Sequence, residues 1–211
     1  MYQHGLKRVL DFLLALCGLL VLWPVFVIIA AAIKIDDPGP VFFSQKRVGL
    51  HKRYFRLYKF RSMKVSTPDV PTHLLEHPEQ YISRVGGFLR KTSLDELPQL
   101  LNILRGDMAV IGPRPALWSQ EDLIAERDKY GANDVRPGLT GWAQINGRDE
   151  LTIEEKSAYD GEYVRKLCFA FDCKCFFGTI GAVLRHDGVV EGTAGAPKEK
   201  QEETEQELVE K

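Results

Sequence analysis

A run of 22 residues without a charged side chain, Phe12–Ile33, constrains this 211-residue chain more than any other feature. As a straight helix the run would extend about 33 Å, which is enough to cross the hydrocarbon core of a bilayer. A run this long and uniformly apolar is rare inside a soluble protein. We do not expect a cleavable signal peptide, because no small-residue cleavage site and cysteine-paired domain follow. The sequence therefore predicts a membrane segment.

Two features of the membrane segment argue against a simple span. Trp23-Pro24 lies in its middle, where the proline removes a helical hydrogen bond and predicts a kink. Basic residues flank both ends, with Lys7 and Arg8 before the run and Lys34 after it. Cationic flanks favour the cytoplasmic face, so both ends of the segment would prefer the same side of the membrane. A re-entrant helix that dips into one leaflet would place them there. A spanning helix stays open as the alternative. Polar backbone freed at the kink would need protein packed against it.

Charge is distributed unevenly along a chain whose net charge is −1. Between Pro38 and Pro68 there are eight Lys or Arg and no Asp or Glu. Such a block beside a membrane segment predicts contact with phosphates, either of lipid headgroups or of a substrate. From Gly192 to Lys211 there are six Glu against three Lys and no aromatic residue, so we expect a solvated, disordered tail.

The four cysteines do not form a recognisable metal or disulfide pattern. Three of them lack a nearby His or a matching second pair, and the fourth lies in the apolar run; they are Cys17, Cys168, Cys173 and Cys175. We therefore expect buried free thiols in a reducing compartment.

The remaining sequence alternates short strands with helices. Thr152 and Glu155 form a capping box, and Gly106 is a helix stop after a row of leucines at helical spacing. The pattern predicts strands at 41–45 and 53–60, an apolar run at 109–111, a loop at 136–141, and helices near 81–91, 94–105, 117–130, 152–167 and 169–184. This is a mainly helical α+β fold.

Ser93-Leu94-Asp95-Glu96, at the start of the leucine-spaced helix, has two interpretations. Ser93 with Glu96 three residues later is a capping box, in which acidic residues stabilise the first turn. Alternatively, an ionised carboxylate held at a helix start can attack phosphorus to form an acyl phosphate. A neighbouring carboxylate can then act as a base or help to hold Mg²⁺. The segment alone leaves both open.

Several cations are candidates for binding phosphate. Two prolines fix the backbone around Arg114 in Gly112-Pro113-Arg114-Pro115, and Arg136 precedes Pro137-Gly138 in a similar way. Lys59 and Arg61 in the basic block, and Arg90 before Asp95, extend the set. A rigid surface turn or a solvated side chain is the alternative for each of them.

Taken together, these motifs resemble the bacterial sugar transferase family, and specifically its small monotopic phosphoglycosyl transferases. The resemblance covers residues 4–186 and rests on the order of Lys7–Asp11, Tyr58–Met63, Thr92–Leu100, Arg105–Met108, Gly112–Pro115, Arg136–Gly141 and Gln144–Arg148. It implies a re-entrant membrane anchor in residues 1–36, a cytosolic catalytic domain in residues 37–190, and an acidic tail in residues 191–211. It places the protein at the cytoplasmic face of the bacterial inner membrane.

The resemblance also implies a Mg²⁺-dependent reaction in two steps. Asp95 would contact Mg²⁺ and attack the β-phosphate of a UDP-sugar, releasing UMP, with Glu96 as a base or metal partner. The acceptor, polyprenyl (undecaprenyl) phosphate, would then take the phosphosugar from Asp95. This is the first membrane step in the assembly of bacterial polysaccharides or glycoproteins. A homo-oligomer is also possible within such a family.

Family positions linked to phosphate handling match Lys59, Arg90 and Arg114, and an acidic family position matches Asp172. The full set of expected substrate-binding residues is Lys59, Arg61, Arg90, Arg114, Arg136, Asn146 and Arg148. One departure is that Trp23-Pro24 replaces the family's Ser-Pro at the break of the membrane helix, so no hydroxyl can bond the freed backbone there.

A non-catalytic membrane-surface module, in which the basic block holds anionic lipid, is the alternative from a different class. It predicts that Asp95→Asn leaves function intact. Nucleic-acid binding fits poorly, because the basic block adjoins a membrane segment and the chain as a whole is not basic.

Overall fold

The computed structural model describes residues 2–68, 77–147 and 150–185, and the acidic tail lies outside them. The described chain is mainly helical, as predicted, with two small sheets. Its helices are α1 (Lys7–Asp36), α2 (Arg84–Lys91), α3 (Gln99–Arg105), α4 (Glu121–Asp128), α5 (Trp142–Ile145), α6 (Ile153–Lys166) and α7 (Phe169–Arg185). Its strands are β1 (Phe42–Val48), β2 (Tyr54–Phe60), β3 (Ala109–Ile111) and β4 (Gly138–Thr140).

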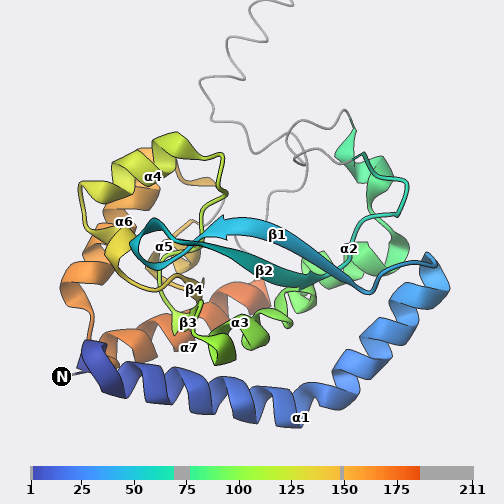
Figure 1. Cartoon of the computed structure of the whole chain (residues 1–211), viewed down its shortest axis with the longest axis horizontal. Helices are drawn as coiled ribbons and strands as arrows, with labels where there is room; N and C mark the ends of the chain where they lie inside the picture. The colour runs from blue at the N-terminus through green and yellow to red at the C-terminus, as the bar shows by residue number, and fades with distance from the viewer. Residues whose placement is uncertain (1, 69–76, 148–149, 186–211) are drawn as a thin grey trace, which may run out of the picture.

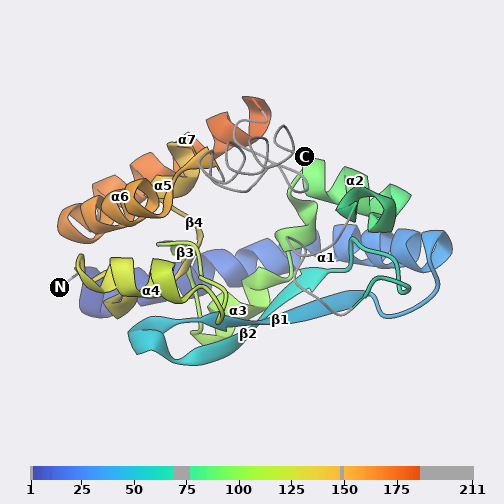
Figure 2. The ribbon, with the colours of Figure 1, turned by 90° about the horizontal axis from the view of Figure 1, so that it is seen from above.

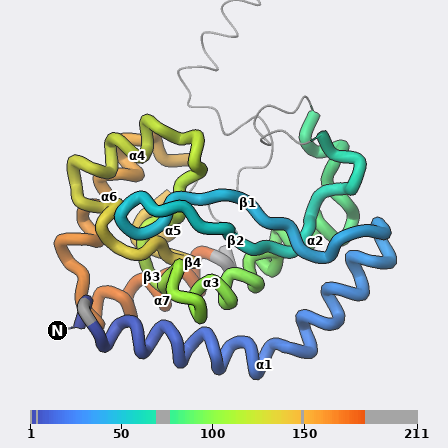
Figure 3. The backbone as a smooth tube through the Cα atoms, in the orientation of Figure 1, coloured from blue at the N-terminus to red at the C-terminus, as the bar shows by residue number. Residues whose placement is uncertain are grey.

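Helix α1 is the one helix among the described residues that is long and apolar enough to cross a membrane. It runs for 30 residues with Pro24 inside it, and Figures 1 and 3 show it bent near its middle along one edge of the molecule. The predicted kink is therefore a bend within one continuous helix. One flank packs on the rest of the protein through residues such as Ala15 and Ile29. Val21 and Ile28, in contrast, are 74% and 67% exposed, which leaves an uncovered apolar flank.

Both ends of α1 are tied to the domain that follows it. Near the N-terminus, the Lys7 Nζ atom lies 2.6 Å from the Asp172 carboxylate on α7. At the C-terminus, the Asp37 carboxylate lies 2.8 Å from the Arg61 guanidinium just after β2. Anchor and domain therefore form one packed unit.

Strands β1 and β2 form an antiparallel hairpin with Phe42 opposite Phe60 and Val48 opposite Tyr54. The hairpin confirms the two predicted strands, although β1 extends to Val48. Figure 2 shows the hairpin on one side of the molecule and α6 with α7 on the other. This arrangement brings Lys59, near the end of β2, toward the segment between α2 and α3.

Strands β3 and β4 form a two-stranded parallel sheet. This sheet places the Gly112–Pro115 motif beside the Arg136–Gly141 motif. The Gly112 amide donates to the Thr140 carbonyl at 2.8 Å, and the Gly138 amide donates to Pro113 at 2.8 Å. A Cβ atom on Gly138 would lie 2.1 Å from the Gly112 nitrogen, so only glycine permits this approach. The predicted loop at 136–141 is therefore partly a strand.

The main apolar core lies between α1, α3, β3, α6 and α7, and includes Ile103, Met108, Tyr163 and Cys175. All four cysteines are free, as predicted. Of the four, only Cys175 is buried as expected, and Cys173 is half-buried. Cys17 is exposed because it lies on the uncovered surface of α1, and Cys168 is exposed because it lies in the connection between α6 and α7.

Candidate active site

Asp95 and Glu96 lie in a short 3₁₀ turn, Leu94–Glu96, between α2 and α3. The predicted capping box is wrong here. Ser93 has φ 56°, in the left-handed region, and its hydroxyl makes no capping hydrogen bond. A capping serine needs extended backbone angles, which this turn does not provide. Helix α3 instead begins after Pro98, so both carboxylates precede the helix and are buried at the turn.

Two cations from distant segments enclose this carboxylate pair. The Lys59 Nζ atom lies 2.8 Å from Glu96 Oε1 and 3.4 Å from Asp95 Oδ2. Arg114 contacts both oxygens of Glu96, with Nη2 2.6 Å from Oε1 and Nη1 3.3 Å from Oε2. The structure thus brings together four residues that the sequence analysis selected from three separate motifs.

The two carboxylates differ in charge environment. Burial opposes ionisation of Glu96, but Arg114 and Lys59 outweigh it and hold the pKa of Glu96 well below its usual value. Burial raises the pKa of Asp95, Lys59 lowers it, and the Glu96 charge raises it again, so its pKa stays above the ordinary value. Glu96 is therefore the clamped anion, and Asp95 is the less neutralised and more basic carboxylate of the pair.

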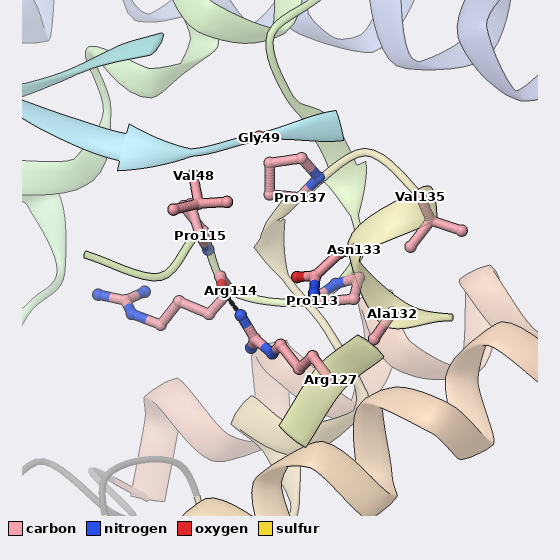
Figure 4. Close-up of a pocket in the computed structure, with 10 residues that line it drawn as sticks. All are labelled: Val48, Gly49, Pro113, Arg114, Pro115, Arg127, Ala132, Asn133, Val135 and Pro137. Atoms are coloured by element: carbon pink, nitrogen blue, oxygen red, sulfur yellow. Dashed lines mark hydrogen bonds between the residues drawn. The ribbon is translucent and has the colours of Figure 1, made fainter. Parts of the chain in front are cut away.

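A buried ion pair braces Arg114 from behind. Arg127 on α4 donates from Nη1 to the Arg114 carbonyl at 2.9 Å and from Nε to Asp160 on α6 at 2.8 Å. Both partners are almost fully buried, and Figure 4 shows Arg127 directed at the Arg114 backbone. Sequence reasoning missed this pair, because neither residue belongs to a motif and each is one of several charged residues on its helix.

The same bracing region contains a shallow recess that is open to solvent. Its wall includes Val48, Pro113, Asn133 and Val135. Figure 4 shows the Arg114 side chain pointing away from Asn133 and Val135, and its guanidinium contacts Glu96. Asp95 and Glu96 do not line the recess.

Arg61 and Arg90, two further predicted phosphate ligands, have structural partners. Arg61 is buried and pairs with Asp37 at the end of α1. Arg90 donates from Nε to the Ser62 hydroxyl at 3.0 Å, which ties α2 to the segment after β2. The ion pairs described for Asp95 and Glu96 are with Lys59 and Arg114.

The C-terminal candidates lie on other segments. Arg136 donates to the Gly106 carbonyl at 3.1 Å, and the Asn146 amide donates to the Trp142 carbonyl at 2.7 Å. Arg148 lies outside the described residues. Their roles as substrate ligands stay predictions.

Asp172 acts at a junction between helices. Its carboxylate accepts hydrogen bonds from Lys7 at 2.6 Å, from the Tyr163 hydroxyl at 2.8 Å, and from the Tyr2 hydroxyl. These contacts join the start of α1 to α6 and α7. Asp172 therefore holds the start of α1 against the domain, and the possible support that the family match predicts for it at the site stays a prediction.

Mg²⁺ prefers oxygen donors, so Asp95 and Glu96 are the candidates to hold it in this site. Among the described residues, no group of three or more His, Cys, Asp or Glu side chains is arranged as a metal site. Mg²⁺ commonly binds through one or two carboxylates completed by substrate phosphates and water. Asp95, which Arg114 does not clamp, fits the protein part of such a site, and substrate oxygens would have to complete it.

These features define a membrane-associated protein that holds a carboxylate pair among cations. The chain belongs to the bacterial sugar transferase family, whose sequence profile matches residues 2–186. The resemblance to this family inferred from the motifs is thus confirmed.

Its relatives include larger and similarly sized proteins. The UDP-glucose:undecaprenyl-phosphate glucose-1-phosphate transferase of Escherichia coli (strain K12) is 40% identical over 188 residues, covering 83% of this chain but 39% of its own length. The sugar transferase EpsL of Bacillus subtilis (strain 168) is 40% identical over 189 residues, covering 87% of this chain and 90% of its own. The exopolysaccharide production protein ExoY of Rhizobium meliloti (strain 1021) is 37% identical over 197 residues, covering 86% and 87%. The chain thus spans well under half of the E. coli relative.

Proposed function

We propose that this protein transfers a sugar-1-phosphate from a UDP-sugar to undecaprenyl phosphate, releasing UMP, in the assembly of a bacterial polysaccharide or glycoprotein. The observation that carries the proposal is the buried Asp95–Glu96 pair held between Lys59 and Arg114. The E. coli relative's name states a reaction of this type.

In the first step, an Asp95 oxygen attacks the β-phosphorus of the UDP-sugar. An acyl phosphate forms between Asp95 and the phosphosugar, the bond from that phosphorus to the bridging oxygen breaks, and UMP leaves with the electron pair. In the second step, an oxygen of the lipid phosphate attacks the same phosphorus, forms the diphosphate and releases the Asp95 carboxylate. Displacement through a covalent carboxylate adduct divides one difficult transfer into two easier ones.

The surrounding cations suit both steps. Lys59 contacts both carboxylates and faces the position where negative charge gathers on the transferred phosphate. Glu96, held ionised, orients Lys59 and Arg114 and is poorly suited to accept a proton near neutral pH. Bound Mg²⁺ would supply further charge neutralisation through Asp95 and substrate oxygens.

We further propose that α1 enters and leaves the membrane by the cytoplasmic face of the inner membrane. A spanning helix would place its two ends on opposite sides of a core about 30 Å thick. The ion pairs Lys7–Asp172 and Asp37–Arg61 instead attach both ends to the same domain. The exposed flank of α1 would face lipid, and its bend would keep the segment in one leaflet.

Turnover by the purified protein in nanodiscs tests the reaction. With Mg²⁺, undecaprenyl phosphate and a panel of UDP-sugars, wild-type protein should release UMP, and Asp95→Asn should lose essentially all of it. Mass spectrometry under trapping conditions should find the phosphosugar on Asp95. The exposed Asp122→Asn on α4 is the matched control and should retain activity. No UMP with any sugar would overturn the proposal, and full activity of Asp95→Asn would favour the non-catalytic membrane module.

A further inference from the structure

Arg47, on β1, lies beside the site but is not one of the two cations, Lys59 and Arg114, that pair with the carboxylates. It donates from Nη1 to the Pro115 carbonyl at 3.0 Å, immediately after Arg114, and from Nη2 to Gln45 Oε1 at 2.8 Å. Its backbone also bridges to Leu117. The guanidinium of Arg47 is therefore fixed against the loop that carries Arg114, the partner of Glu96.

This guanidinium has no counter-charge among the described residues. The side chains of Lys59, Arg61, Arg114 and Arg127 each have a carboxylate within ion-pair distance, whereas that of Arg47 does not. Its Nε atom is buried without a hydrogen-bond partner. Burying a charge or a polar group without a partner is costly, so the unpaired Nε atom and the missing counter-charge of Arg47 need a structural or functional reason.

The charges around Arg47 place it within the field of the site. Burial, followed by repulsion from Arg114, lowers its pKa to about 10, and Glu96 partly offsets this. Arg47 therefore stays protonated at neutral pH. Counting Arg47, Lys59 and Arg114 against Asp95 and Glu96 gives three positive charges and two negative ones, an excess that favours an incoming anion.

We propose that Arg47 is a phosphate-binding residue of this site, an inference that rests on the proposed transferase function. Its ligand is a phosphate group, carried either by the nucleotide donor or by the lipid acceptor. The Pro115 and Gln45 contacts hold the guanidinium in place, and the phosphate supplies the missing anion. Arginine suits the position because its planar donors match phosphate oxygens.

A simple brace between β1 and the Arg114 loop predicts different behaviour. Arg47→Gln retains an amide that can donate to the Pro115 carbonyl but removes the charge. Arg47→Lys retains the charge but loses the planar set of donors. If Arg47 only braced the loop, the Gln and Lys variants would differ from wild type in stability, and their affinity for phosphate would not change.

The test measures binding by the full chain in nanodiscs. Three probes separate the sources of phosphate: UDP, uridine as the uncharged control, and undecaprenyl phosphate. Arg47→Gln should weaken binding of UDP or of undecaprenyl phosphate by about tenfold or more, because bonds to charged groups are worth that much. Binding of uridine should not change, and Arg47→Lys should give an intermediate affinity. The exposed Arg165→Gln on α6 is the matched control and should bind as wild type.

A measurement on wild-type protein covers the case in which Arg47→Gln fails to fold. Phenylglyoxal, which modifies arginine, should react with Arg47 less in the presence of UDP or undecaprenyl phosphate, as read by peptide mass spectrometry. Binding of both ligands by Arg47→Gln within twofold of wild type, or no protection of Arg47 by either, would overturn the inference. Wild-type protein that releases no UMP would instead count against the proposed function.

Discussion

Arg127 and Asp160 are separated by β4 and α5 in the chain, yet they meet behind Arg114 with almost no solvent contact. Burial raises the pKa of Asp160, and Arg127 opposes that rise. The position of Arg114, and through it the Glu96 clamp, depends on this pair. Arg127 can therefore affect the site through the position of Arg114, without contacting a substrate itself.

The bracing pair makes a prediction about stability. Asp160→Asn leaves the buried Arg127 charge without its partner and should lower the free energy of unfolding by about 3–5 kcal/mol. Replacing both residues, as in Arg127→Met with Asp160→Leu, should cost less than Asp160→Asn alone, because no charge stays buried. Denaturant unfolding in detergent measures both. A double variant as unstable as the sum of the single variants would contradict the idea.

Two thiols near one end of α7 should differ in reactivity. Burial, and then the Asp172 charge, raises the pKa of Cys175 to about 12, whereas Cys168 is exposed. Because the thiolate is the reactive form, Cys175 stays protonated at pH 8 and reacts only as the pH approaches its raised pKa. Iodoacetamide at pH 8 should therefore label Cys168 and spare Cys175 in the folded protein, as resolved by mass spectrometry.

Denaturant provides the control for this labelling. Once the chain is unfolded, both thiols should react at similar rates. Rapid labelling of Cys175 in the folded state would show that α7 does not pack as described.

At the scale of elements, two segments share the pattern Ser or Thr, then Glu three residues later, but fold differently. Thr152 caps α6 in full, accepting from the Glu155 amide at 3.2 Å while Glu155 bonds back to the Thr152 amide. Ser93 makes no such bond. Thr152→Ala should therefore lower the free energy of unfolding by about 1 kcal/mol, and Ser93→Ala by about half of that or less. Equal losses from the two substitutions would show that Ser93 caps after all.

Most elements could be predicted because their signals are local. The alternation in 53–60 and the spacing of leucines before Gly106 depend on neighbours in sequence. Strand β4 escaped prediction because its three residues are specified by pairing with β3, almost thirty residues earlier in the chain. The site divides in the same way between local and distant signals. Lys59, Asp95 and Arg114 could be selected because each belongs to a local sequence motif. Arg127 and Arg47 could not, because their importance comes from burial and from partners that the sequence does not display.

The whole molecule makes a prediction about topology. If α1 returns to the face it entered, a cysteine introduced at exposed Gln3 and the native Cys168 should lie on the same side of the membrane. An impermeant maleimide should label both in inverted inner-membrane vesicles and neither in intact spheroplasts. Lysed spheroplasts, in which both faces are open, are the control. Labelling of Gln3→Cys but not Cys168 in intact spheroplasts would establish a spanning helix.

The attachment of α1 at both of its ends has a consequence for how lipid reaches the enzyme. Asp172 and Arg61 grip the helix on either side of its bend, so the domain cannot swing on a tether. With α1 held in one leaflet as proposed, the height of Asp95 above the lipid tails would be a fixed dimension of the fold. In the proposed reaction, the long-chain acceptor would then need only to diffuse sideways in its leaflet, and its headgroup would arrive at the level of Asp95 without being lifted out of the bilayer.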